Sequence, residues 1–363
     1  MALTILTILA VALLAFANGA NDVSKGVATL AGSGRTSYRT AIAWGTLWTC
    51  LGAGASVPIS FGLVNAFTSS LVGPQVLSLP TFALAVAASA AAWVIVASVT
   101  GLPVSTTHAL TGAILGVAVM AGGLGVVNWW MLIAAIAAPL ALSPLISAGI
   151  GYVAHPIASR LAPACVCIRQ DVAIDGAASD GSVIGRAVSQ VVVSACGCAA
   201  AEDTRQFVPA GTVHWGAAAL LSFARGVNDN AKLAAIALLG LSVTESAVWV
   251  AFAVTAAAMT IGSYTAGLRV TRTLGERVVH MDGDTGLAAA VVAAGLVMAA
   301  SFYALPVSTT HVSTGAIVGA GLRQGDRAVQ WRRVRALVSA WVGTLPIAAG
   351  LGAIIAWQLT SPR

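Results

Sequence analysis

Charged residues are scarce in this chain. Asp, Glu, Lys and Arg make up 8% of its 363 residues, whereas a soluble domain has about 25%. Hydrophobic residues make up 58%, and they gather in runs of roughly the length that crosses a lipid bilayer. This composition excludes a soluble globular protein and predicts an all-α integral membrane protein.

Three further absences narrow the possibilities. The net charge is +6, but there is no continuous basic face, which argues against a nucleic-acid partner. No Lys or Arg precedes the apolar run at residues 3–17, so we interpret it as a transmembrane segment rather than a signal peptide. Cysteines number only five. Four of them form two Cys-x-Cys pairs, Cys165/Cys167 and Cys196/Cys198. These pairs could bind zinc or act in redox chemistry, or they could belong to a linker without such a role. We take the linker as the prediction and therefore expect no cofactor or metal.

Two motifs occur twice, in the same order. The stretch FANGANDVSKG at residues 16–26 returns as FARGVNDNAKL at 223–233, and LPVSTTHALTGAILG at 102–116 returns as LPVSTTHVSTGAIVG at 305–319. The offsets, 207 and 203 residues, are nearly equal. This pattern indicates duplication of a large structural unit.

The duplication divides the chain into a first transmembrane repeat (1–155), a cytoplasmic linker (156–211) and a second repeat (212–363). Each repeat holds five apolar segments, and an odd number inserts the second repeat in the opposite orientation. The predicted segments are about 2–31, 40–66, 79–100, 102–122, 127–155, 212–241, 246–268, 286–304, 305–322 and 336–358. The uncharged joints at 101–103 and 304–306 fit either full crossings or helical hairpins that carry the PVSTTH motifs and dip into the membrane.

Basic residues predict the orientation. With the N-terminus outside, 14 of the 18 Lys and Arg residues fall in cytoplasmic connections, as the positive-inside rule requires. They are Arg35, Arg39, Arg160, Arg169, Arg186, Arg205, Arg269, Arg272, Arg277, Arg323, Arg327, Arg332, Arg333 and Arg335. We therefore predict a multi-pass protein of the cytoplasmic membrane with both termini outside.

Five charged residues fall within the apolar runs or at their ends: Asp22, Lys25, Arg225, Asp229 and Lys232. Each costs about 2.5 to 3.5 kcal/mol at the centre of a membrane helix, so they must be paired, hydrated or bound to a ligand. The plainest alternative is two intrahelical ion pairs, each between an Asp and the Lys three residues later. Carboxylates at this depth are also suited to carry a coupling ion, a cation or a proton.

Glycine and asparagine surround the two acids. Gly19, Gly26 and Gly226 permit local unwinding, so we expect broken helices whose free backbone groups help to coordinate ions. Asn21 and Asn228 add amide oxygens beside Asp22 and Asp229.

The PVSTTH segments predict anion binding. Proline followed by Ser-Thr-Thr is typical of a helix start, where hydroxyls and free backbone amides meet the positive end of the helix dipole. The residues concerned are Ser105, Thr106, Thr107, Ser308, Thr309 and Thr310. Plain capping is the alternative. His108 and His311 follow one turn later, as structural hydrogen-bonding groups or as a proton relay.

Together these residues resemble the PiT family of inorganic phosphate transporters. The resemblance rests on Asn21-Asp22 after Gly-Ala and on the downstream PVSTTH segment, both duplicated, and it covers nearly the whole chain outside the linker. It implies an inverted-repeat helical fold with a phosphate site between the halves. It also implies that the Asn-Asp and Ser-Thr-Thr segments supply ligands and that Na+ or H+ drives uptake, with some relatives carrying sulfate instead.

Three residues depart from the family pattern. Family members commonly have GANDVANA in both copies, so Lys25 and Lys232 stand where Asn is usual, and Arg225 replaces a small or polar residue. An ammonium there would repel Na+. The added positive charge would strengthen anion binding or stand in for a coupling cation, which favours H+ over Na+.

We therefore predict a secondary transporter that imports inorganic phosphate by symport with H+ or Na+, not an enzyme. The predicted phosphate ligands are the two Ser-Thr-Thr segments with Asn21, Asn228, Lys25, Lys232 and Arg225, while the two aspartates take the coupling ion. A sulfate transporter of the same fold and a passive anion channel remain alternatives. A hydrolase built on the Ser-Thr-Thr-His segment would not need both motifs twice. A homodimer is possible.

Overall fold

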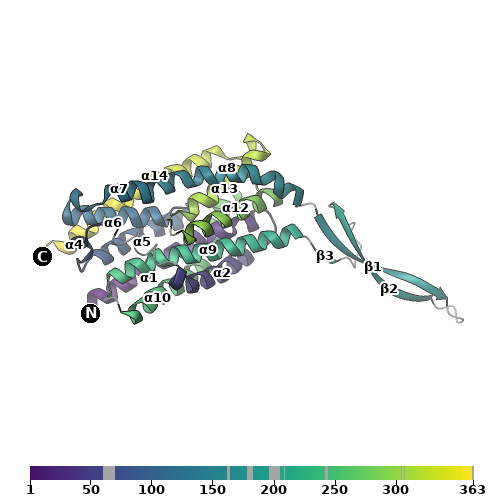
Figure 1. Ribbon diagram of the computed structural model, residues 1–363, viewed down its shortest axis with the longest axis horizontal. Helices are drawn as coiled ribbons and strands as arrows, with labels where there is room; N and C mark the ends of the chain where they lie inside the picture. Colours follow the sequence, from purple (N-terminus) through teal and green to yellow (C-terminus); the bar gives the residue numbers. More distant parts are fainter. Residues whose placement is uncertain are drawn as a thin grey trace.

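The computed structural model is a bundle of long helices with a small sheet at one end (Figure 1). It describes residues 1–59, 70–161, 164–177, 183–195, 205–207, 209–241, 244–303, 305 and 307–361. The first half contains α1 (Ala2–Gly32), α2 (Tyr38–Ile59), α4 (Pro74–Leu77), α5 (Phe82–Thr100), α6 (Thr106–Gly122), η1 (Leu124–Val126), α7 (Trp129–Met131), the π-helical η2 (Leu132–Ala137) and α8 (Ala138–Leu161). The second half contains α9 (Pro209–Leu239), α10 (Glu245–Ala266), α11 (Leu268–Glu276), α12 (Gly283–Phe302), α13 (Thr309–Gln324), η3 (Asp326–Ala328) and α14 (Trp331–Thr360).

Each of the ten apolar segments predicted from the sequence corresponds to a helix in the described part of the chain. The prediction for 40–66 can be compared only as far as residue 59. By length and composition, six of the described helices can span a membrane: α1, α5, α10, α12, α14 and the continuous helical stretch from α7 to α8.

The linker between the halves holds three antiparallel strands, β1 (Ala164–Ala177), β2 (Val183–Ala195) and β3 (Arg205–Phe207), in the order β2-β1-β3. The all-α prediction therefore holds for the bundle and misses this sheet, although the valines of β2 are typical of a strand. Cys165 and Cys167 lie on β1. Cys196 and Cys198 lie outside the described residues, and the metal or redox role of the four stays a hypothesis.

The two halves are inverted copies that interlock. Helix α1 starts at the end of the bundle that holds both termini, whereas α9 starts at the opposite end, from which the strands project (Figure 1). The most extensive packing between helices comes in matched pairs across the halves: α6 with α14 and α13 with α8, and α1 with α10 and α9 with α2. Each half therefore completes the core of the other.

Glycines permit this interlocking. Both α1 and α9 run unbroken through their motifs, so the predicted unwinding at Gly19, Gly26 and Gly226 is wrong. A Cβ at Gly19 would overlap the carbonyl of Met259 on α10, and one at Gly226 would overlap the carbonyl of Thr49 on α2. Small residues let the helix backbones touch, and an intact helix leaves no backbone group unpaired in an apolar setting.

The hairpins α5–α6 and α12–α13 each occupy one half of the bundle length (Figure 1). Helix α5 ends at Gly101, whose φ of 77° is a left-handed conformation that favours glycine. The tips then meet, because the hydroxyl of Thr310 donates to the carbonyl of Val104 at 2.9 Å. Of the two interpretations open from sequence, this geometry supports hairpins that enter from opposite ends and stop midway.

Candidate functional site

The charged motif of α1 lies in its most buried stretch. Every residue from Ala17 to Ala31 is buried, although a helix that only borders a core would expose one face. Surrounding helices and the hairpin tips therefore enclose the motif on all sides. Among the described residues, the buried side chains with a full charge are Asp22 and Lys25 on α1 and Arg225, Asp229 and Lys232 on α9.

Lys25 is held by four oxygen atoms. Its Nζ forms an ion pair with Asp22 and donates to Asn21 Oδ1 at 2.8 Å, to the Asn21 carbonyl at 3.2 Å and to the Val104 carbonyl at 3.3 Å. The intrahelical ion pair that the sequence left open as an alternative is thus present. It is also more than a pair, because the ammonium joins α1 to the tip of the first hairpin.

Lys232 repeats this arrangement in the second half. Its Nζ donates to the Val307 carbonyl at 3.3 Å and lies 3.4 Å from Asp229 Oδ1, and Val307 is the repeat counterpart of Val104. It also donates to Thr107 Oγ1 of the first hairpin at 3.0 Å. Each lysine therefore ties its helix to its own hairpin tip, and Lys232 additionally reaches across the halves.

Asn18 is a central residue that the sequence analysis did not single out. Its buried Nδ2 lies 3.0 Å from Thr106 Oγ1, 3.2 Å from Asp22 Oδ2 and 3.4 Å from Asp229 Oδ2. It thereby connects the two aspartates, which come from different halves. A signal was available, because the 207-residue offset aligns Asn18 with Arg225.

The asparagines beside the aspartates differ in how fully they are used. Asn21 donates to the Leu102 carbonyl at 2.9 Å and to Ser98 Oγ at 3.1 Å, while its Oδ1 accepts from the Val104 amide and from Lys25. Asn228 donates to a serine of α12 at 3.4 Å, and its Oδ1 has no hydrogen-bond partner among the described residues. Of these two asparagines, only Asn228 retains a free ligand atom among the described residues, and the Oδ1 of Asn18 is likewise without a partner there.

Arg225 is fully buried on α9 with spare donors. Its Nη2 donates to Thr49 Oγ1 at 3.0 Å and to Ser263 Oγ at 3.2 Å. Its Nε and Nη1 have no partner within the described part of the chain. A buried guanidinium with unpaired N–H groups is costly unless a ligand completes it, and its fork geometry suits an oxyanion.

The PVSTTH segments begin helices, as predicted. Ser105 and Ser308 are the N-cap residues of α6 and α13, and their hydroxyls accept from the amides of His108 and His311 at 3.2 and 3.3 Å. The serines thus have a structural role. The following threonines lie in the first turns, where amides lack an intrahelical acceptor and both helix dipoles point their positive ends at mid-bundle.

The two histidines face each other between the halves. Their ring centroids lie 4.8 Å apart, and His311 also packs 4.2 Å from the ring of Trp341. Nδ1 of His311 donates to the Leu140 carbonyl at 2.8 Å, which leaves Nε2 as a possible acceptor. This bond gives His311 a structural role, and the proton relay stays a hypothesis. Ser105 meets His108 through the histidine amide, so the contact is a cap rather than a nucleophile–base pair.

The charges of the site do not cancel. Three cations and two carboxylates give the five buried side chains a formal charge of +1. An uncompensated charge in a low-dielectric interior is costly, and binding a monoanion would neutralise it. The arrangement, with two helix starts beside it, is therefore suited to hold one small oxyanion between the halves.

Comparison with known proteins agrees with this chemistry. The model of a family described as "Phosphate transporter family" matches residues 18–352. A Bacillus subtilis protein named "Probable low-affinity inorganic phosphate transporter" is 29% identical over 361 residues, covering 97% of this chain and 96% of its own. The Arabidopsis thaliana "Inorganic phosphate transporter 2-1, chloroplastic" is 27% identical and covers 94% and 70%. A solved structure titled "The sodium-dependent phosphate transporter" shares the fold, with a TM-score of 0.78, 20% identity and 99% coverage of both chains.

Proposed function

This chain belongs to the phosphate transporter family, and we propose from that membership and from its buried charges that it imports inorganic phosphate by symport with protons. The bacterial and archaeal relatives favour a plasma membrane. Sulfate is not favoured, because the family and the relatives are named for phosphate. Phosphate at neutral pH also keeps a proton that it can donate to a carboxylate, whereas sulfate has none.

The four oxygens around Lys25 are the observation that carries the choice of proton. A carboxylate, an amide oxygen and two backbone carbonyls are the hard ligands that a small metal cation would take. Here the lysine's own ammonium fills that position. A tethered cation cannot leave with the substrate, so a Na+ ion would have to displace it, whereas a proton would only change the charge of the existing pair.

Asp22 is the proposed proton acceptor. A proton on its carboxylate removes one negative charge, which raises the formal charge of the site from +1 to +2 and releases the Lys25 ammonium from its partner. Anion binding then becomes more favourable. By reciprocity, bound phosphate promotes protonation, and this mutual dependence is what couples the two movements. Asp229 and Lys232, at 3.4 Å, provide a second and looser copy.

Phosphate would be held where the halves meet. The unpaired Nε and Nη1 of Arg225 and the first-turn amides of α6 and α13 supply donors, and the released lysine adds charge. Alternating access follows if α1, α9 and the two hairpins move against the remaining helices. The two lysines would restrain this motion, because each donates a hydrogen bond to a carbonyl at a hairpin tip, that of Val104 or Val307.

The passive channel is less well supported. A channel offers its ion a polar path with weak, repeated sites, whereas Asn18, Asp22 and Lys25 are almost fully buried and bonded to one another. Such a closed cluster fits a carrier that must rearrange to release its substrate.

Uptake of labelled phosphate into proteoliposomes tests the proposal. H+ and Na+ gradients are imposed separately, with unlabelled sulfate as competitor. We expect an inward proton gradient to drive accumulation without Na+, and sulfate to compete poorly. A strict Na+ requirement would contradict proton coupling and keep the transporter. Uptake that follows the phosphate gradient alone would indicate a channel.

A further inference from the structure

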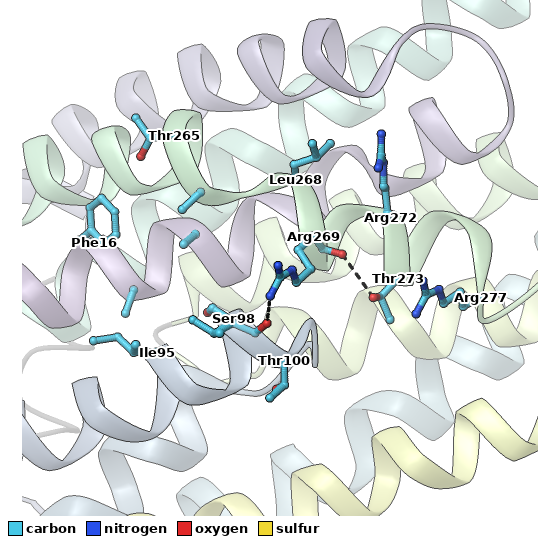
Figure 2. Close-up of a pocket in the computed structure, with 14 residues that line it drawn as sticks. Phe16, Ile95, Ser98, Thr100, Thr265, Leu268, Arg269, Arg272, Thr273 and Arg277 are labelled. Atoms are coloured by element: carbon cyan, nitrogen blue, oxygen red, sulfur yellow. Dashed lines mark hydrogen bonds between the residues drawn. The ribbon is translucent and has the colours of Figure 1, made fainter.

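A cavity of about 900 Å³ lies beside the charged site. It is formed by α1, α5, α10 and α11, and Figure 2 shows three arginines along its α11 side, Arg269, Arg272 and Arg277. Its other polar groups include Ser98 of α5 and Thr265 of α10. A large cavity with several cations and hydroxyls is a suitable place for an anion, and nothing in the function proposed above uses it.

The floor of the cavity is one hydrogen bond from the site. Ala17, Ala20 and Ser98 line it, and Ser98 Oγ accepts from Asn21 Nδ2 at 3.1 Å. The Oδ1 atom of the same Asn21 amide accepts a hydrogen bond from Lys25 Nζ. The Asn21 side chain therefore lies between the cavity and the buried cations. It also donates a hydrogen bond to the Leu102 carbonyl at the tip of the first hairpin.

The cavity extends along α1 toward the end of the bundle that carries the strands. It runs from Phe16, midway along α1, to α11, which packs against the C-terminal end of α1 where Gly32 meets Gly275. Because α1 begins at the opposite end (Figure 1), α11 leads from Arg269, beside the tip of the first hairpin, toward the strand end. This is the end that the distribution of basic residues predicts to be cytoplasmic.

The three arginines are exposed and keep donors available. Arg269 donates to the carbonyl of Val99 at the end of α5 (Figure 2), and Arg272 lies 5.8 Å from the centre of the Tyr38 ring. The corresponding stretch of the first repeat, residues 60–73, has no charged residue. The trio is thus present in the second repeat and absent from the first.

We infer that this cavity is a vestibule that binds phosphate transiently as it passes between the strand end and the central site. The inference rests on the proposed function. Three guanidinium groups raise the local concentration of an anion and speed its arrival, by an amount that falls with ionic strength. Rearrangement of the Asn21–Ser98 contact then admits the anion to the buried cations.

Neutralising the trio tests the vestibule. The triple variant R269Q/R272Q/R277Q is compared with R332Q/R333Q/R335Q, whose arginines are exposed near the start of α14 at the same end and do not line the cavity. The double variant R272Q/R277Q leaves the Arg269 contact to α5 intact. We measure phosphate flux in both directions in oriented proteoliposomes of neutral lipid at low ionic strength.

We expect the Michaelis constant for phosphate presented at the strand end to rise about 5- to 20-fold, within the range of electrostatic steering. The constant at the opposite end and the maximal rates should stay within about twofold, and added salt should shrink the difference. An equal change in the control variant would overturn the vestibule. So would an effect that appears only with anionic lipid, because the cavity would then hold a lipid headgroup.

Arginine modification gives a readout that does not depend on transport. Inorganic phosphate should slow the reaction of phenylglyoxal with Arg272 and Arg277 in the purified protein, and leave Arg332 unprotected. Protection in a protein that carries no phosphate would support a phosphate site in the cavity, but it would refute the proposed function and with it the role of the cavity as a vestibule. Phosphate transport without protection of the arginines would support the proposed function and refute the vestibule.

Discussion

Replacing Lys25 with asparagine should convert the tethered cation into an empty cation site. The change removes an ammonium from four oxygens and leaves the Asp22 carboxylate buried without its partner. Breaking a buried ion pair in this way costs about 3 to 5 kcal/mol. A Na+ ion that fills the gap at 100 times its dissociation constant would return about 2.7 kcal/mol. Na+ should therefore restore roughly half or more of the lost stability.

Thermal unfolding of the purified protein in detergent measures this effect. Wild type, Lys25→Asn and Lys25→Met are compared in NaCl and in choline chloride at equal ionic strength. We expect both variants to melt at lower temperature than wild type in choline, and only Lys25→Asn to recover in Na+, because the methionine side chain is about as long as lysine and fills the space between the four oxygens, whereas the shorter asparagine leaves that space open and adds an oxygen ligand. Lys232→Asn should respond less, since its ion pair is longer, at 3.4 Å.

Two results would refute this reasoning. Equal melting of Lys25→Asn in Na+ and choline would show that the four oxygens do not form a cation site. Stabilisation of the wild type by Na+ would show that a sodium site exists despite the lysine, and proton coupling would lose its main support.

Three further substitutions test other parts of the site. Asp22→Asn should abolish accumulation driven by a proton gradient while exchange of labelled for unlabelled phosphate continues, and retained accumulation would remove Asp22 from the coupling. Arg225→Gln should raise the dissociation constant for phosphate, measured by calorimetry, about 10- to 150-fold. This is the effect of losing one charge-assisted hydrogen bond of about 1.5 to 3 kcal/mol. Unchanged binding would place the anion elsewhere. Gly19→Ala should lower the free energy of unfolding by about 1 to 3 kcal/mol, because the added Cβ overlaps α10. Gly216→Ala is the control, since the space around its Cβ position is open. It should be neutral or raise the free energy of unfolding by up to about 1 kcal/mol. Equal melting of the two glycine variants would contradict the packing role.

The sequence by itself was enough to predict the helices, their duplication and the charged centre. Apolar length is set by bilayer thickness and is readable without a structure. Likewise, a charge such as Asp22 inside an apolar run must be paired, hydrated or bound to a ligand, and its spacing from Lys25 made an intrahelical ion pair one of these alternatives. The start of α6 after Ser105 was equally predictable, because proline and serine act on the backbone of their own turn.

Only the tertiary structure decided how these parts meet. Three features depend on contacts between distant segments. Asn18 joins two aspartates that are 207 residues apart, Thr310 bonds the hairpin tip at Val104, and Gly19 packs against α10 instead of unwinding α1. Local propensity cannot distinguish a glycine that breaks a helix from one that lets two helices touch, because the difference lies in the neighbour. The arginine cavity likewise exists only because α1, α5, α10 and α11 enclose it.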